Sequence, residues 1–341
     1  MSVIRAGRRG GSGTPGGAVR GLVAACFFVV TLATPYVRGA AGPDNPFKGR
    51  RLYVDPSSPA RKQADAWQRT RPQDAAYMRY IADQPQAIWL GGWLRDARGE
   101  TDALVTRIVA ARALPVFVAY NIPYRDCGMY SAGGARGGDE YRRWIRDVAT
   151  GLKGREAVFI LEPDGLAAID CLPLRLKDER YVLMREAVKT LKSARAHVYI
   201  DAGNANWQQV GEAADRLIKA GIDLADGFSL NVSNFHATQV NITYGDKLSR
   251  LVGGKHYVID TSRNGVGKSV EKEWCNARNQ ALGERPTTDT KAPLADAFLW
   301  IKTPGQSDGT CNGGPKAGDW WADYALELSK MAAVLSRTIP R

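Results

Sequence analysis

The sequence predicts an α/β protein whose parallel strands curl into a distorted TIM-like barrel of seven to eight strands. Short apolar runs recur along the chain, most of them about 30 to 40 residues apart: 51–54, 87–90, 116–120, 158–161, 198–200, 227–232, 257–259 and 297–301. Segments with helical periodicity lie between most of these runs. Strands that are apolar throughout and alternate with helices are typical of a parallel sheet covered by helices.

Four of the intervening segments show the helical pattern most clearly: 102–113, 180–191, 209–220 and 320–335. In the second of them, Leu183, Val188 and Leu191 fall on one apolar stripe. The length of 341 residues alone would favour about two domains, but an α/β barrel of about 250 residues or more is a single domain. A hydrophobic content of 44% is ample for a large core.

The beginning of the chain has the pattern of a secretory signal. A basic, glycine-rich stretch precedes the apolar run 22–34, and the small residues 39–41 follow it. We therefore divide the chain into a signal peptide, residues 1–41, and one domain, residues 42–341, and expect a secreted, extracellular protein, with the cell envelope as the alternative location. A single membrane anchor is the other interpretation of the run, so membrane contact is expected only if the leader stays uncleaved.

The charge balance weighs against nucleic acid as a partner. The formal net charge is +12, and the first 41 residues contribute five arginines and no acidic residue, which leaves +7 for the rest. That excess is spread along the chain without a long basic block, which favours a solvated basic surface. We expect a monomer with no nucleic-acid partner.

Five cysteines are present, and Cys26 lies in the leader. Four remain in the predicted domain, and an even number in an exported protein indicates two disulfides, for which the count allows three pairings. Zinc is the alternative, but no closely spaced cysteine pair exists and the only histidines are His197, His236 and His256. We expect no metal and no cofactor.

Acidic side chains follow the ends of several predicted strands: Asp126, Glu162, Asp164, Asp201 and Asp308. Because the carboxyl ends of parallel strands meet at one edge of a barrel, these groups must converge if the barrel forms. Crowded carboxylates repel one another, so some of them should have raised pKa values. A carboxyl group with a raised pKa is what general acid catalysis near neutral pH needs.

Six motifs resemble glycoside hydrolase family 6, the β-1,4-glucan hydrolases, and follow the order of that family: VAYNIPYRDCGMYSAGG (118–134), FILEPDGLA (159–167), YIDAGNANW (199–207), DTSRNG (260–265), EWCN (273–276) and LWIKTPGQSDG (299–309). The second departs from the family pattern at Phe159 and Gly165. The resemblance extends over residues 45–339. It implies an incompletely closed barrel and inverting hydrolysis without a metal or cofactor. It also implies the disulfides Cys127–Cys171 and Cys275–Cys311.

The resemblance assigns roles to four aspartates. Asp164 is implied to be the general acid, Asp126 to raise the pKa of that acid and help orient water, and Asp201 to tune the charge. Asp308 matches the residue often given the role of general base. Arg263 and Lys302 are expected to pair with Asp308, and such pairing weakens a base. The alternative is that Asp126 acts through water. Arg125, beside Asp126, is a further candidate for charge pairing.

Other matched positions concern the sugar. Tyr120 is placed under the ring that is cleaved, Trp207 and Trp274 match stacking platforms, and Asn234 matches a hydrogen-bonding position. Trp89 and Trp93 flank a strand end and are further stacking candidates. Two positions depart from the family pattern: Asn204 stands where a histidine is frequent, and Gln306 replaces a usual glutamate, which puts an acidic role there in doubt. Lys302 is expected near the substrate.

The sequence therefore predicts an endo-acting, inverting hydrolase of β-1,4-glucosidic bonds in cellulose or a related β-glucan. Endo action is expected because the stretches from Asp126 to Asp164 and from Asp308 to the last helix are short, which favours an open cleft. The alternative is a non-catalytic glycan-binding protein on the same barrel. Such a protein would keep the tryptophans and lose an acid, whereas all four aspartates are present.

Overall fold

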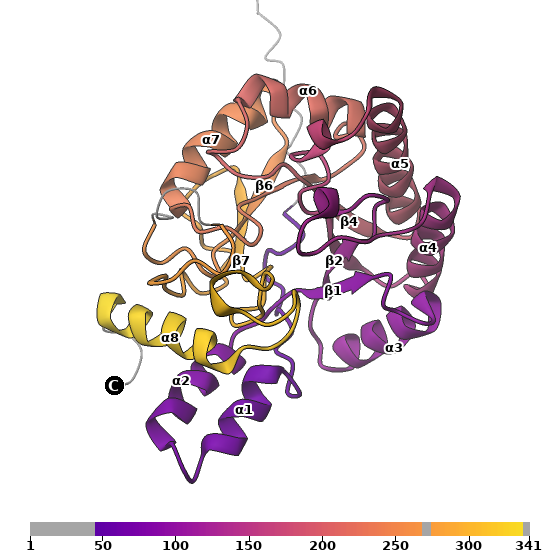
Figure 1. Cartoon of the computed structure of the whole chain (residues 1–341). Coiled ribbons are helices and arrows are strands. Elements are labelled where there is room, and N and C mark those ends of the chain that lie inside the picture. The colour runs from indigo at the N-terminus through magenta and orange to yellow at the C-terminus, as the bar shows by residue number, and fades with distance from the viewer. Residues whose placement is uncertain (1–44, 268–273, 337–341) are drawn as a thin grey trace, which may run out of the picture. The chain divides into compact units, whose positions relative to one another are not determined.

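The computed structural model describes residues 45–267 and 274–336 (Figure 1). Its parallel sheet contains the strands β1 (Ile88–Gly91), β2 (Val116–Tyr120), β3 (Ala157–Leu161), β4 (Ala196–Asp201), β5 (Gly227–Leu230), β6 (His256–Asp260) and β7 (Ala295–Leu299). Each strand pairs with the next in the chain, so the order in the sheet is the order in the sequence. The prediction of a distorted α/β barrel is confirmed, with seven strands. Residues 1–41, the predicted signal peptide or anchor, lie outside the described residues.

The barrel is not closed between β1 and β7. A backbone bond joins them beside the strands, from Ala87 N–H to the Trp300 carbonyl at 3.0 Å. The indole of Trp89 adds a second bond to the Ile301 carbonyl at 2.8 Å. The first predicted run, 51–54, forms an isolated bridge between Leu52 and Leu114 and is not a strand of the sheet. Of the eight predicted runs, all of them within the described residues, this one alone does not form a strand of the sheet.

The helices are α1 (Pro59–Trp67), α2 (Pro72–Ala82), α3 (Ala97–Ala110), α4 (Gly138–Gly151), α5 (Leu174–Ser193), α6 (Val210–Ala220), α7 (Thr238–Leu251) and α8 (Ala322–Ser336). The first two precede β1, α3 to α7 each lie between two successive strands from β1 to β6, and α8 follows β7. The four predicted segments correspond to α3, α5, α6 and α8. The helices α1, α2 and α8 lie side by side (Figure 1) and share a separate apolar cluster that includes Met78, Trp300 and Tyr324. Within the described ranges, no helix has the length and apolar character that a membrane crossing needs.

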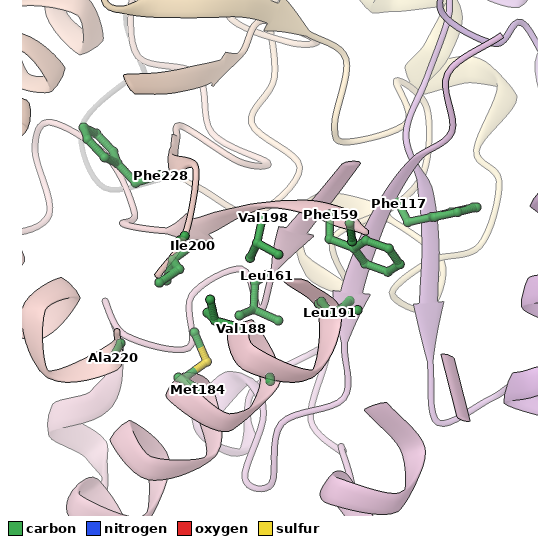
Figure 2. Close-up of a cluster of buried hydrophobic side chains, with 14 of the residues drawn as sticks. Phe117, Phe159, Leu161, Met184, Val188, Leu191, Val198, Ile200, Ala220 and Phe228 are labelled. Atoms are coloured by element: carbon green, nitrogen blue, oxygen red, sulfur yellow. The ribbon is translucent and has the colours of Figure 1, made fainter. Parts of the chain in front are cut away.

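The main core lies between the strands and the covering helices. Leu161 and Val198 point from the strands toward Val188 of α5, and the ring of Phe159 lies beside that of Phe117 (Figure 2). Alternate residues of the same strands, such as Val158 and Ile160, belong to a cluster on the inner face of the sheet. Because successive strand residues face opposite sides, both faces are buried. Each fully buried aliphatic or aromatic side chain contributes about 1.5–3 kcal/mol, which makes the strands a rigid base for the loops that follow them.

The loop after β2 folds back onto the end of that strand. Ala135 N–H donates to the Asn121 carbonyl at 2.9 Å, and Arg125 N–H donates to the Gly133 carbonyl at 3.2 Å. Gly134 makes this return possible: its φ is +90°, and a Cβ there would meet the Ile122 carbonyl oxygen at 1.9 Å. Only glycine fits such a close approach in that conformation. The loop is thereby fixed with Asp126 at the carboxyl end of the barrel.

Candidate active site

Asp164 and Asp201, from neighbouring strand ends, are joined directly. The backbone N–H of Asp164 donates to Asp201 Oδ1 at 3.0 Å. Asp201 also accepts bonds from Gly203 N–H and the Ser229 hydroxyl, at 3.0 and 2.9 Å. Burial raises the pKa of Asp201 to about 7 against the opposing effect of these donors, and the charge of Asp260 adds to the rise. Asp201 therefore fixes the backbone of Asp164 and can hold a proton at neutral pH.

The carboxyl group of Asp164 lies among negative charges. Burial raises its pKa well above the usual value, and the charges of Asp201, Asp126 and Asp308 raise it further. The ammonium of Lys302 acts in the opposite direction. The backbone of Asp164 is in the left-handed region with φ +67°, a conformation that persists only where surrounding contacts enforce it. Such a carboxyl group is suited to donate a proton.

Asp126 lies at the turn of the loop after β2 and also has a left-handed backbone, with φ +57°. Its carboxylate accepts a bond from Ser131 N–H at 2.6 Å. Burial raises the pKa of Asp126, the Ser131 donor and the Arg125 charge lower it, and the charge of Asp308 raises it; the net direction is upward. Asp126 is thus a better proton acceptor than an ordinary surface aspartate.

Asp308 is held in a buried network of cations and donors. Arg263 Nη1 lies 2.8 Å from Asp308 Oδ2, and Lys302 Nζ lies 3.1 Å from Oδ1. The N–H of Asn276 donates to Oδ2 at 2.9 Å. Burial acts to raise the pKa of Asp308, but the charges of Arg263 and Lys302 outweigh it, so the pKa is lowered. The expected pairing is present, and it makes Asp308 a weak base.

Aromatic side chains form a wall next to these carboxylates. The rings of Tyr120 and Trp89 meet edge to face with centroids 5.1 Å apart. The guanidinium of Arg125 lies over Tyr120, 4.5 Å from the centroid, and 5.7 Å from the ring of Trp93. The Arg125 guanidinium donates hydrogen bonds to the carbonyl groups of Tyr120 and Ser131, at 2.8 Å each. It acts on Asp126 through its charge, by lowering the pKa of that group.

A pocket of about 620 Å³ borders this wall. Trp89, Trp93, Tyr120, Lys302 and Gln306 are among the residues that line it. The exposed large aromatic side chains of the described residues all lie on loops that follow strand ends: Trp93, Tyr124, Tyr130, Trp207 and Trp274. Flat apolar rings that face solvent around a cleft are suited to stack on the faces of sugar rings.

Two further predicted substrate residues, Asn204 and Asn234, lie on the loops after β4 and β5. The Asn204 side chain is buried and caps the N–H of Asn206 at 3.0 Å. The Asn234 side chain donates to the Val232 carbonyl at 3.0 Å and is partly exposed. The structure thus gives both side chains a hydrogen bond within their own loop, and Asn234 is the more exposed of the two.

The four cysteines are paired as the resemblance implies. Cys127 is bonded to Cys171, and Cys275 is bonded to Cys311. The first bridge joins the loops that carry Asp126 and Asp164. The second joins the loop that carries Trp274 to the loop that carries Asp308. In residues 45–267 and 274–336, no cluster of three or more His, Cys, Asp or Glu side chains is arranged to hold a metal ion.

Three supporting residues received no role in the sequence analysis. Glu162 is fully buried and accepts bonds from Asn121 and Ile122 N–H, at 2.9 and 3.0 Å. Asp260 accepts from Ser233 and Lys302 N–H at 3.0 and 2.9 Å. The apolar runs place Glu162 at a predicted strand end together with Asp201, and the same rule applies to Asp260, which ends another apolar run. Asn276 exchanges two bonds with Asp308, and no sequence pattern signals that role.

The fold and the site define a class of protein. It is an open parallel barrel in which carboxyl groups with raised and lowered pKa values lie next to exposed aromatic rings. The model of the glycosyl hydrolases family 6 matches residues 47–332. The chain belongs to that family.

Its relatives include Endoglucanase A of Cellulomonas fimi, 45% identical over 82% of this chain, and Endoglucanase A of Thermobispora bispora, 41% identical over 86%. The chain spans 61% and 65% of the lengths of these two proteins. Endoglucanase 1 of Streptomyces halstedii is 36% identical, with 90% of this chain and 96% of that protein covered.

Among solved structures, the endoglucanase Cel6 of Mycobacterium tuberculosis, in complex with methyl-cellobiosyl-4-deoxy-4-thio-β-D-cellobioside, is similar with a TM-score of 0.81 and 45% identity. The match covers 85% of this chain and 99% of that one. The endoglucanase CEL6B of Humicola insolens matches with a TM-score of 0.74 and 25% identity over 84% and 98%.

Proposed function

We propose that this chain is an exported, endo-acting enzyme that hydrolyses β-1,4-glucosidic bonds in cellulose or a related β-glucan with inversion at the anomeric carbon. The observation that carries the proposal is the cluster of Asp164, Asp126, Asp201 and Asp308, in which the pKa of Asp164 is raised and that of Asp308 is lowered. Family membership and relatives named endoglucanases support the substrate class and the endo mode.

In the proposed reaction, Asp164 protonates the glycosidic oxygen as the bond to the anomeric carbon breaks. A water molecule attacks the opposite face of the sugar ring and loses a proton. Tyr120 packs under the ring, and Trp207 and Trp274 hold neighbouring sugar units by stacking. No step uses a metal or cofactor.

The proton of the attacking water needs an acceptor, and two candidates remain. Asp308 is the direct candidate, but its two ion pairs with Arg263 and Lys302 lower its basicity. These contacts favour a role in which Asp308 and its cations balance the charge of the site. The raised pKa of Asp126 supports the route in which Asp126 accepts the proton through water.

Two disulfides in the described part support an exported protein, and we propose that it acts as a monomer on a polysaccharide, without nucleic acid. The non-catalytic alternative predicts binding of a glucan without cleavage. The presence of all four aspartates around a shared site favours the enzyme.

Release of reducing ends from soluble carboxymethyl cellulose tests the proposal, with Asp164→Asn as the control. NMR of the first product should show the α-anomer before mutarotation, because an inverting enzyme produces it from a β-linked glucan. First appearance of the β-anomer would contradict inversion, and binding without cleavage would support the non-catalytic alternative.

A further inference from the structure

Arg180 of α5 connects two loops that carry candidate catalytic carboxyl groups. The residue is 3% exposed. Its Nη1 donates to the Gly165 carbonyl at 3.0 Å, directly after Asp164. Its Nη2 donates to the Pro123 carbonyl and, at 3.3 Å, to the Tyr124 carbonyl, which precede Asp126. One buried guanidinium therefore binds the loop after β2 and the loop after β3 together.

The backbone at both ends of this connection is strained. The non-glycine residues in the left-handed region on the two loops are Tyr124, Asp126, Cys127, Glu162 and Asp164, with φ between +51° and +67°. Such conformations persist only where surrounding contacts enforce them. The acceptors of Arg180 are the carbonyls next to these positions. Loss of the guanidinium would free the strained segments to relax.

We propose that Arg180 is a positioning residue that sets the separation of Asp126 and Asp164 by holding their loops to each other. The assignment rests on the proposed hydrolase function for its kinetic consequence. Its geometric part, the tie between the two loops, does not depend on that function.

An arginine fits this place better than a lysine. The guanidinium is planar and presents several N–H donors in fixed directions, so it can bind carbonyls of two segments at once. A lysine ammonium is a compact group on a flexible stem and would hold one segment or the other. Glu162 and Tyr141 are the titratable groups that face Arg180, and the charge of Glu162 compensates part of the cost of burying the cation.

The disulfide Cys127–Cys171 joins the same two loops on another side. It provides a readout that does not require activity. If Arg180 holds the loops, Arg180→Lys should make this bridge easier to reduce, while Cys275–Cys311 keeps its wild-type rate. The test variants are Arg180→Lys and Arg180→Gln.

Arg155→Lys is the control, because Arg155 also donates to two carbonyls, those of Leu152 and Gly151, and lies just before β3, where it pairs with Asp102 away from the site. The experiment measures the rate of dithiothreitol reduction of each bridge by mass spectrometry. It also measures kcat, KM and the pH profile of kcat on soluble carboxymethyl cellulose.

We expect Arg180→Lys to lower kcat by about 10- to 100-fold with little change in KM, since a small misplacement of catalytic groups acts on the chemical step. The alkaline limb of the pH profile of kcat should move to lower pH. Asp201, Asp126, Asp308 and Lys302 face Asp164, and withdrawal of Asp126 removes one charge that favours its protonated form. Arg155→Lys should lower the melting temperature without changing either the pH limb or the reduction rate.

The proposal is overturned if Arg180→Lys lowers only the melting temperature, with wild-type reduction rates and a wild-type pH limb. It is also overturned if neither Arg180 variant folds, because Arg180 would then sustain the fold as a whole. A wild-type protein that does not cleave glucan defeats the proposed function alone, and the reduction rates still decide whether Arg180 ties the loops.

Discussion

Asp164 and Asp308 share one site, yet their surroundings shift their pKa values in opposite directions. Burial and three neighbouring aspartates raise the pKa of Asp164, whereas Arg263 and Lys302 lower that of Asp308. Opposed environments of this kind separate a proton donor from a permanently ionised group. The two residues should therefore respond differently to the same substitution.

Asp164→Asn should lower turnover on unactivated glucans by about 10²–10⁴-fold, which is the usual contribution of general acid catalysis. The loss should be smaller on an aryl glycoside with a good leaving group, because such a group needs less protonation. Steady-state kinetics on both substrates measure the difference. An equal loss on the two would remove Asp164 from the role of acid.

Asp308→Ala should destabilise the folded protein by about 3–5 kcal/mol, because it leaves the buried cations Arg263 and Lys302 without their partner. Urea unfolding followed by tryptophan fluorescence measures this effect. The surface pair Arg136–Glu140 offers a control, and Glu140→Ala should change stability far less than Asp308→Ala does. Similar losses for both variants would mean that the Asp308 network adds little to stability.

At the scale of elements, the loops after the strands are held by a recurring arrangement. A buried carboxylate at the end of one strand accepts backbone N–H groups of a neighbouring loop, as Glu162 does for Asn121 and Asp260 does for Lys302. The disulfides add covalent ties to the same loops. Precision in the site thus comes from contacts between loops as well as from the rigid strands below them.

Reduction of the protein from residue 42 onward should release four thiols and lower its melting temperature. Each native disulfide typically stabilises a protein by about 2–4 kcal/mol. Thiol titration in denaturant, with and without prior reduction, gives the count, and calorimetry gives the temperature change. Free thiols in the oxidised protein would be incompatible with the two bridges.

The strands could be predicted from sequence because each contains a short apolar run, although β5 and β7 also contain Ser229 and Asp296. The run 51–54 has a similar pattern, but within the described fold it pairs only through the isolated bridge to Leu114. The helix α7 was harder to recognise, since it buries polar Asn241 and Ser249. Asn241 is satisfied there by bonds to the carbonyls of His236 and Ala237. Such partners are set by the folded loop and leave no periodic pattern.

For the candidate site, the residue types at the strand ends could be predicted, and the contacts between loops could not. Asp126, Asp164 and Asp201 each follow an apolar run, so their convergence followed from the fold. The disulfide pairing required the family resemblance, because the count allowed three solutions. The bond from Asp164 N–H to Asp201 and the bonds of Arg180 depend on left-handed backbone in the loops, which the sequence alone does not specify.

At the scale of the whole molecule, buried titratable groups tie stability to pH. Glu162 and Asp201 have pKa values of about 7 in the folded protein, against about 4 in an unfolded chain. Between these values the folded state binds more protons, so its stability falls as the pH rises. His197 acts in the same direction: its raised pKa gives stability that is present below its unfolded pKa and is lost as the pH rises through its folded pKa.

The melting temperature should therefore be higher in mildly acidic solution than at pH 8. Below about pH 4 the trend reverses, because the pKa of Asp226 is lowered to about 2 and its stabilisation is lost as it is protonated. Scanning calorimetry from pH 3 to 8 measures the curve, and Glu162→Gln should flatten the part between pH 5 and 7. A melting temperature that rises from pH 5 to 8 would contradict this account.

The gap between β1 and β7 is the place where the barrel should open most easily. Along the β3–β4 ladder, separation would break a continuous series of paired residues, whereas the gap is spanned beside the strands by the bonds from Ala87 and Trp89. Local opening needs the least free energy where fewest bonds are broken. Trp89 and Lys302 stand on the two sides of this gap and line the same pocket. The wall of the pocket at this gap is therefore its most compliant part. Widening there would move Asp308, on the loop after β7, relative to Asp126, Asp164 and Asp201 at the ends of β2 to β4.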